Sequence, residues 1–159
     1  MPGHESRTIL PAPGESRRGE GQVFDRQFNA AVEFVDGNVA AGRGARVAYR
    51  DRLGELTYGE LAERSQRVGP ALGSLGLRRE ERVLLLMQDT RDFPVVFWGC
   101  IRAGIVPVPL NTLLAADQYR YILEDSRARA VVVSAPLLPV LQTALTQCRS
   151  QPPVVVAGE

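Results

Sequence analysis

Few side chains in this sequence can do nucleophilic or metal-binding chemistry. The 159 residues include two cysteines, Cys100 and Cys148, and one histidine, His4. Their spacing matches no zinc site, and His4 lies in a polar terminal segment where it cannot activate a serine or cysteine nucleophile. The favoured interpretation is two buried, reduced cysteines, and we predict no catalytic residue and no metal ligand.

Phosphate chemistry is restricted in a second way, because all 19 basic residues are arginine. An arginine-rich coding bias accounts for most of this pattern. The consequence holds nevertheless: the chain has no lysine to hold a phosphate, form a Schiff base or act as a nucleophile. It also contains no Gly-x-x-x-x-Gly-Lys phosphate loop.

Composition is that of an ordinary globular protein, with 45% hydrophobic and 23% charged residues and a net charge of +1. This balance gives no reason to expect a nucleic-acid or membrane partner. No apolar run approaches the ~20 residues that cross a bilayer, and the N-terminus has no secretory signal, so we expect a cytoplasmic protein. Residues 1–22 are predicted to be a disordered tail, and residues 23–159 a single domain.

The first half of that domain is predicted to be mainly helical. A helix over 28–39 has Phe28, Val32, Val35 and Val39 at helical spacing, and two short strands around "DRLG" form a hairpin. The pair Thr57 and Glu60 forms a capping box that begins the next helix. Its inner stripe is expected to comprise Leu61, Val68, Leu72 and Leu75. Pro70 should split this helix near residues 68–69.

The second half alternates apolar strands with helices. Strands are predicted at 82–87, 104–110, 129–134 and 153–158, and helices at 92–103, 115–126 and 136–148. This alternation predicts an α/β fold of right-handed βαβ units in a mostly parallel sheet that is covered on both faces.

The sequence "GIVPVPLNT" poses a local problem, because proline donates no hydrogen bond to a strand ladder. Gly104 is expected to end a helix, and Pro107 and Pro109 to lie where the following strand leaves its ladder. Ligands bind at the carboxyl ends of strands in open α/β sheets, which places Asn111, Thr112 and the residues after them at the ligand edge. A plain strand-to-helix connection is the competing interpretation.

Two segments resemble a known family. "LTYGELAER" (56–64) and "IRAGIVPVPLNT" (101–112) resemble the first two core motifs of the adenylate-forming, AMP-binding synthetase superfamily. "FNAAVEFVDGNV" (28–39) and residues 89–134 resemble benzoate-type aryl-CoA ligases in particular. The positions that match the motifs are Leu56, Thr57, Tyr58, Glu60, Leu61, Gly104, Pro107 and Pro109, and we assign them structural roles.

The resemblance implies the first part of the large N-terminal domain of an acyl-CoA synthetase-like fold. Such enzymes join an aryl carboxylate to ATP and then pass the acyl group from AMP to coenzyme A. The full-length enzyme uses ATP, Mg²⁺ and coenzyme A, and its phosphate loop, magnesium ligand and catalytic lysine come after the matching region. The resemblance therefore implies an incomplete domain over 23–159, inactive alone and without cofactors of its own.

By the same resemblance, Asn111, Thr112 and Leu113 lie near coenzyme A. Some family members carry a basic residue at the position of Leu113 that helps bind the coenzyme A nucleotide. Leucine supplies no charge for that contact.

Three alternatives remain open at this point. The chain could be a non-catalytic nucleotide-binding or interaction module, although the candidate fingerprint for it, Gly42-x-Gly44, lacks a third glycine and precedes its strand. It could also be part of another acyl-CoA synthetase or of a carrier-protein adenylation domain. An exposed sheet edge is further expected to promote self-association.

Overall fold

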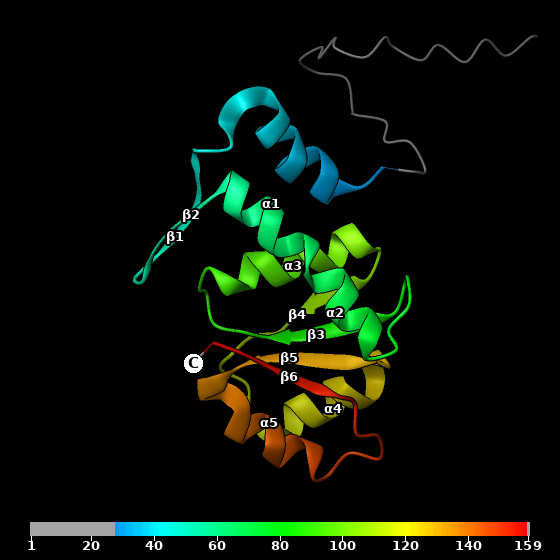
Figure 1. Ribbon diagram of the computed structural model, residues 1–159. Coiled ribbons are helices and arrows are strands. Elements are labelled where there is room, and N and C mark those ends of the chain that lie inside the picture. The colour runs from blue at the N-terminus through cyan, green and yellow to red at the C-terminus, as the bar shows by residue number, and fades with distance from the viewer. Residues whose placement is uncertain (1–27, 159) are drawn as a thin grey trace, which may run out of the picture.

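The computed structural model describes residues 28–158 (Figure 1). The tail predicted for residues 1–22 lies outside the described residues. The elements are η1 (Val32–Asp36), η2 (Val39–Arg43), β1 (Val47–Asp51), β2 (Gly54–Thr57), α1 (Tyr58–Gln66), α2 (Val68–Ser74), β3 (Arg82–Leu86), α3 (Asp92–Ala103), β4 (Val106–Pro109), α4 (Ala116–Ser126), β5 (Ala130–Ser134), η3 (Ala135–Leu137), α5 (Leu138–Leu145) and β6 (Val154–Ala157).

The predicted α/β fold is confirmed. Four parallel strands form a sheet in the order β4-β3-β5-β6, and β1 and β2 form a separate antiparallel hairpin. In Figure 1, α2 and α3 cover one face of the sheet while α4 and α5 cover the other. Strand β3 lies between β4 and β5, and residues 83–86 are completely buried. Val83 and Leu85 face the α3 side and Leu84 and Leu86 the α4 side, as the two-residue period of a strand requires.

Pro107 and Pro109 correct one expectation, because both lie inside β4 and pair in register with Val83 and Leu85. They are tolerated because β4 is an edge strand whose backbone groups alternate in direction. The Val106 N–H donates to the carbonyl oxygen of Glu81, directly before β3, at 2.9 Å, and the Leu110 N–H donates to that of Leu85 at 3.0 Å. Residues 106 and 110 thus face β3, and the two prolines, at the alternate positions, face away from it. On that side β4 has no partner strand among the described residues, so the missing N–H groups cost this sheet no hydrogen bond.

The segment before the hairpin is helical over residues 30–43, but η1 and η2 are wound as π-helices. An i→i+5 turn moves side chains away from the stripe that α-helical spacing predicts. Val35 is buried as expected, whereas Val32 is 50% and Val39 38% exposed. Ion pairing anchors the segment instead: Asp36 accepts two hydrogen bonds from Arg102 of α3, at 2.5 and 2.7 Å.

The capping box at the start of α1 is present as predicted. The Glu60 N–H donates to Thr57 Oγ1 at 3.3 Å, and the Thr57 N–H donates to Glu60 Oε2 at 2.8 Å. The predicted split is also confirmed, because α1 ends before Arg67 and Pro70 lies in the first turn of α2. Leu75 is wrong as an inner residue: it follows the end of α2 and is 43% exposed.

Helix α3 crosses the junction of α1 and α2 at Gly99. A methyl group at this position would lie 2.6 Å from Val68 Cγ2 and 2.8 Å from the Ser65 carbonyl oxygen. Real Cβ atoms essentially never approach other atoms so closely, so only glycine allows this helix packing.

We predict that Gly99→Ala lowers the free energy of unfolding by about 1–3 kcal/mol, because α3 must move away from Val68 and Ser65. Gly73→Ala is the matched control: Gly73 lies in α2, and an added Cβ would meet nothing within 4 Å. Because alanine favours a helix more than glycine does, the free energy of unfolding of Gly73→Ala should be unchanged or raised by up to ~1 kcal/mol. Urea unfolding followed by circular dichroism measures both, and equal effects of the two substitutions would contradict the close packing.

Candidate functional site

The carboxyl ends of the parallel strands lie together on the left of Figure 1, near the C-terminus. From β3 the chain turns to α3 on one face, whereas from β5 it turns to α5 on the other. Adjacent strands whose connections diverge in this way define a topological switch point, where open α/β sheets bind ligands. The crevice of this fold is therefore expected between the ends of β3 and β5.

Two polar residues define that point. The Gln88 N–H donates to Ser134 Oγ at 3.0 Å, which ties the loop after β3 to the end of β5. Ser134 is only 6% exposed. Sequence reasoning missed both residues; the available signal was a single polar residue directly after each buried apolar run, "LLLMQ" and "VVVS".

The hairpin holds the other end of this loop through Asp51. Its carboxylate accepts hydrogen bonds from the Arg91 N–H at 2.8 Å and the Leu53 N–H at 2.8 Å, and it lies 3.3 Å from Arg91 Nε. The Arg91 N–H contributes most to lowering the pKa of Asp51 below its usual value. Because its pKa is lowered, the ionised Asp51 carboxylate stabilises the fold at pH values above its pKa in the unfolded chain. This contribution is lost as the pH falls through the pKa of the folded state.

The residues expected near coenzyme A occupy the loop after β4. Asn111 Oδ1 accepts from the Leu113 N–H at 2.9 Å, so the Asn111 side chain closes its own turn. The buried Tyr119 hydroxyl donates to the Asn111 carbonyl oxygen at 2.7 Å and pins the loop to α4. Thr112 is half-buried, and Leu113 is 88% exposed. Asn111, Thr112 and Leu113 thus lie together at the carboxyl edge, beside the edge strand and not at the switch point.

The remaining candidates have structural surroundings. Both cysteines are free thiols. Burial raises the pKa of Cys100 to about 12, which leaves this thiol unreactive at neutral pH. Cys148 was expected to be buried, but it is only half-buried. Among residues 28–158, no group of three or more His, Cys, Asp or Glu side chains is placed to hold a metal ion. No helix in this range is long and apolar enough to span a bilayer.

Two further motif assignments concern local structure. Hydrogen bonds from the Thr57 N–H and hydroxyl lower the pKa of Glu60, whose carboxylate is used in helix capping. The Gly42-x-Gly44 pair lies at the end of η2, before an antiparallel hairpin. A dinucleotide fingerprint needs a parallel strand before its glycines, so this context excludes it.

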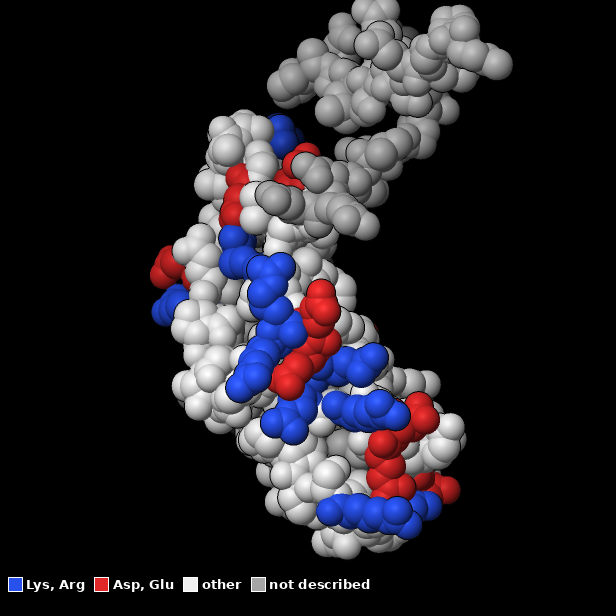
Figure 2. Space-filling view, turned by 90° about the vertical axis from the view of Figure 1, so that its right-hand side faces the viewer, with Lys and Arg blue, Asp and Glu red and all other residues white. Residues whose placement is uncertain are grey.

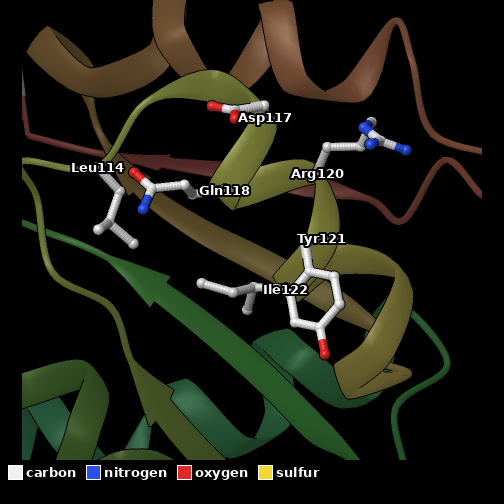
Figure 3. Close-up of a pocket in the computed structure, with 6 residues that line it drawn as sticks. All are labelled: Leu114, Asp117, Gln118, Arg120, Tyr121 and Ile122. Atoms are coloured by element: carbon white, nitrogen blue, oxygen red, sulfur yellow. The ribbon is translucent and has the colours of Figure 1, made fainter.

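A hollow of about 430 Å³ lies beside α4 (Figure 3). Its lining residues are Leu114, Asp117, Gln118, Arg120, Tyr121 and Ile122. All six come from one helix and the turn before it, and Arg120 forms an ion pair with Glu124 at 3.6 Å. Because no second element contributes a converging polar group, the hollow is not a candidate catalytic centre.

A second hollow, of about 330 Å³, is lined by Arg82, Asp125, Ser126 and Arg127. Arg82 begins β3, so this hollow lies at the amino ends of the strands. Figure 2 shows acidic and basic side chains interleaved on this side of the molecule, and one such pair is Arg129 and Glu81 at 3.5 Å. The mixed signs give no uniformly positive surface for a polyanion.

Comparison with known proteins identifies the family. The model of the AMP-binding enzyme family matches residues 37–158. The chain is 52% identical over 134 residues to a 4-hydroxybenzoate–CoA/benzoate–CoA ligase of Rhodopseudomonas palustris. The aligned region covers 84% of this chain and 25% of that protein. It is 44% identical to a benzoate–CoA ligase of Thauera aromatica, and that alignment covers 83% of this chain and 25% of the ligase.

A benzoate CoA ligase of Burkholderia xenovorans LB400 has a similar solved structure, with a TM-score of 0.76 and 43% identity. That match covers 82% of this chain and 26% of the other. An anthranilate CoA ligase in complex with anthranoyl-AMP gives a TM-score of 0.77 at 32% identity. The chain therefore belongs to the AMP-binding enzyme family, and it spans about a quarter of the length of the relatives it matches.

We predict that Tyr119→Phe loosens the loop after β4, because the Asn111 carbonyl oxygen loses the hydroxyl that donates to it. The free energy of unfolding should fall by about 1–2 kcal/mol, and amide exchange over residues 111–115 should accelerate. Tyr121→Phe on the same helix, at a position 66% exposed, is the control and should change neither. Unchanged exchange in Tyr119→Phe would show that another contact holds the loop.

Proposed function

We propose that this chain forms the N-terminal part of an ATP-dependent coenzyme A ligase for aryl carboxylates of the benzoate type. The whole enzyme converts the carboxylate and ATP to an acyl adenylate and pyrophosphate, and then to acyl-CoA and AMP. The observation that carries the proposal is the 52% identity to a hydroxybenzoate/benzoate ligase over most of the chain. A long-chain-fatty-acid–CoA ligase of Mycobacterium tuberculosis is 36% identical over a shorter stretch, 64% of the chain.

The residues of this chain supply neither a lysine ammonium nor a cluster of Mg²⁺ ligands. All 19 Lys and Arg positions are arginine, and among residues 28–158 no carboxylate cluster could hold a metal ion. The charge-stabilising groups for adenylate formation must therefore come from outside this sequence. What this chain supplies is a sheet whose carboxyl edge positions the loops after β3 and β4.

Within the proposed enzyme, Asn111, Thr112 and Leu113 lie on the coenzyme A side of the site. The exposed Leu113 side chain offers coenzyme A an apolar surface but no charge for a phosphate. Asn111 uses its side-chain oxygen within its own turn, so it shapes the loop. We therefore expect this loop to bind coenzyme A through apolar contact and not through ion pairing.

The first experiment transplants residues 28–158 into the matching position of the Rhodopseudomonas palustris ligase. We expect the chimera to form benzoyl-CoA within about tenfold of the parent rate, because the loops at the carboxyl edge would remain compatible with the aryl site. The control chimera carries the matching segment of the Mycobacterium tuberculosis ligase. It should lose substantially more benzoate activity.

The second measurement uses the 159-residue chain alone in ATP–pyrophosphate exchange with benzoate and hydroxybenzoates. No carboxylate-dependent exchange is expected, because no lysine is available. Robust exchange would contradict the assignment of the adenylation chemistry to other residues.

In the first experiment, a chimera with residues 28–158 that unfolds cooperatively yet shows no activity would contradict the assignment to the aryl ligases.

A further inference from the structure

Two carboxylates from earlier elements hold helix α3, one at each of its ends. At the amino end, Asp51 of β1 accepts the Arg91 N–H at 2.8 Å, and the Asp51 side chain is only 7% exposed. At the carboxyl end, Asp36 accepts two hydrogen bonds from Arg102. The two contacts are chemically alike, but only the contact made by Asp51 also fixes a loop at the carboxyl edge of the sheet.

That loop is the loop after β3, residues 88–91. At its start, Ser134 Oγ accepts the Gln88 N–H at 3.0 Å, and at its end Asp51 accepts the Arg91 N–H. The two acceptors lie 46 and 40 residues away in the sequence. Between them, the Thr90 N–H donates to the Gln88 carbonyl oxygen at 2.8 Å. The conformation of this loop therefore depends on two side chains from other elements.

The loop after β3 lies at the switch point between β3 and β5. Both strands are internal to the sheet, with β4 beside β3 and β6 beside β5. Their carboxyl ends are therefore adjacent whatever lies beyond the two outer strands, and open α/β sheets bind ligands at such a point. The residues expected near coenzyme A occupy a different place, the loop after β4, which follows an outer strand.

We propose that Asp51 and Ser134 are positioning residues for the adenylation step, and that they act by fixing the loop after β3 at the crevice where the carboxylate meets ATP. This inference rests on the proposed ligase function. Neither side chain needs to touch a substrate, because each uses an oxygen to accept a backbone N–H of the loop. A displacement of about 1 Å in a site can cost about a hundredfold in rate, so loss of either contact should slow adenylation. Acyl transfer to coenzyme A, on the side of the loop after β4, should be slowed less.

Three substitutions separate this role from general stability. The Asp51 carboxylate accepts the N–H groups of Arg91 and Leu53, and Asp51→Asn replaces one of its oxygens with an NH₂ group that cannot accept, so a backbone N–H loses its partner. Ser134→Ala removes the acceptor at the other end of the loop. Asp36→Asn is the matched control, because it weakens a similar contact to α3 at the end remote from the loop.

Amide exchange of the 159-residue chain tests whether these contacts hold the loop. Exchange over residues 88–92 should accelerate at least about fivefold in Asp51→Asn and in Ser134→Ala, and should be unchanged in Asp36→Asn. This measurement requires no activity, so its result is independent of the ligase assignment. Unchanged exchange in both folded loop variants would overturn the proposal.

The two half-reactions test the catalytic consequence, in the chimera that carries residues 28–158 in the Rhodopseudomonas palustris ligase. ATP–pyrophosphate exchange with benzoate should slow at least about tenfold in Asp51→Asn and about threefold in Ser134→Ala, and stay within about twofold in Asp36→Asn. The formation of benzoyl-CoA from added benzoyl adenylate should stay within about threefold in every variant, whereas a loss of folded enzyme would lower both rates equally.

The unsubstituted chimera distinguishes the two ways in which this inference can fail. If that chimera is inactive, the ligase assignment fails and the inference fails with it. If that chimera is active, the inference alone is overturned by equal exchange rates in Asp51→Asn and Asp36→Asn, or by equal losses in the two half-reactions.

Discussion

The close approach of α3 to the junction of α1 and α2 is the contact on which the arrangement of this molecule depends. Gly99 allows it, because any side chain there would overlap Val68 and the Ser65 carbonyl. Helix α3 also covers β3 and pairs through Arg102 with Asp36. One helix thus connects the sheet with the N-terminal helical segment, and its position sets where the hairpin meets the loop after β3.

That hairpin gives the carboxyl edge its rigidity. Asp51 holds the Arg91 N–H, and Ser134 holds the Gln88 N–H, so both ends of the loop after β3 are fixed from neighbouring elements. The loop after β4 is fixed by Tyr119 from α4. These three hydrogen bonds fix the loops after β3 and β4 at the carboxyl edge of the sheet.

The sequence predicts local features of this fold well. Buried apolar runs locate β3 and β5, the Thr57–Glu60 pair marks the start of α1, and Pro70 marks the split before α2. Each of these signals acts over a few residues, through apolar patterning, a capping hydrogen bond or the missing N–H group of proline.

Features that depend on strand order or helix winding could not be predicted in this way. The ladder position of Pro109 follows from β4 being an edge strand, and the importance of Ser134 follows from β5 lying beside β3. The exposure of Val32 follows from π winding that its α-helical spacing does not reveal. The roles of Asn111 and Leu113 toward coenzyme A remain predictions, since their positions in the loop do not test them.

Thermal unfolding of the 159-residue chain with ligands tests most directly whether this chain positions a site or contains one. Mg²⁺–ATP, AMP and coenzyme A are added separately at millimolar concentration. A positioning role predicts that none of them shifts the midpoint by more than the experimental error. A ligand present at about 100 times its Kd would add about 2.7 kcal/mol of stability, and a saturable shift of that size would contradict it.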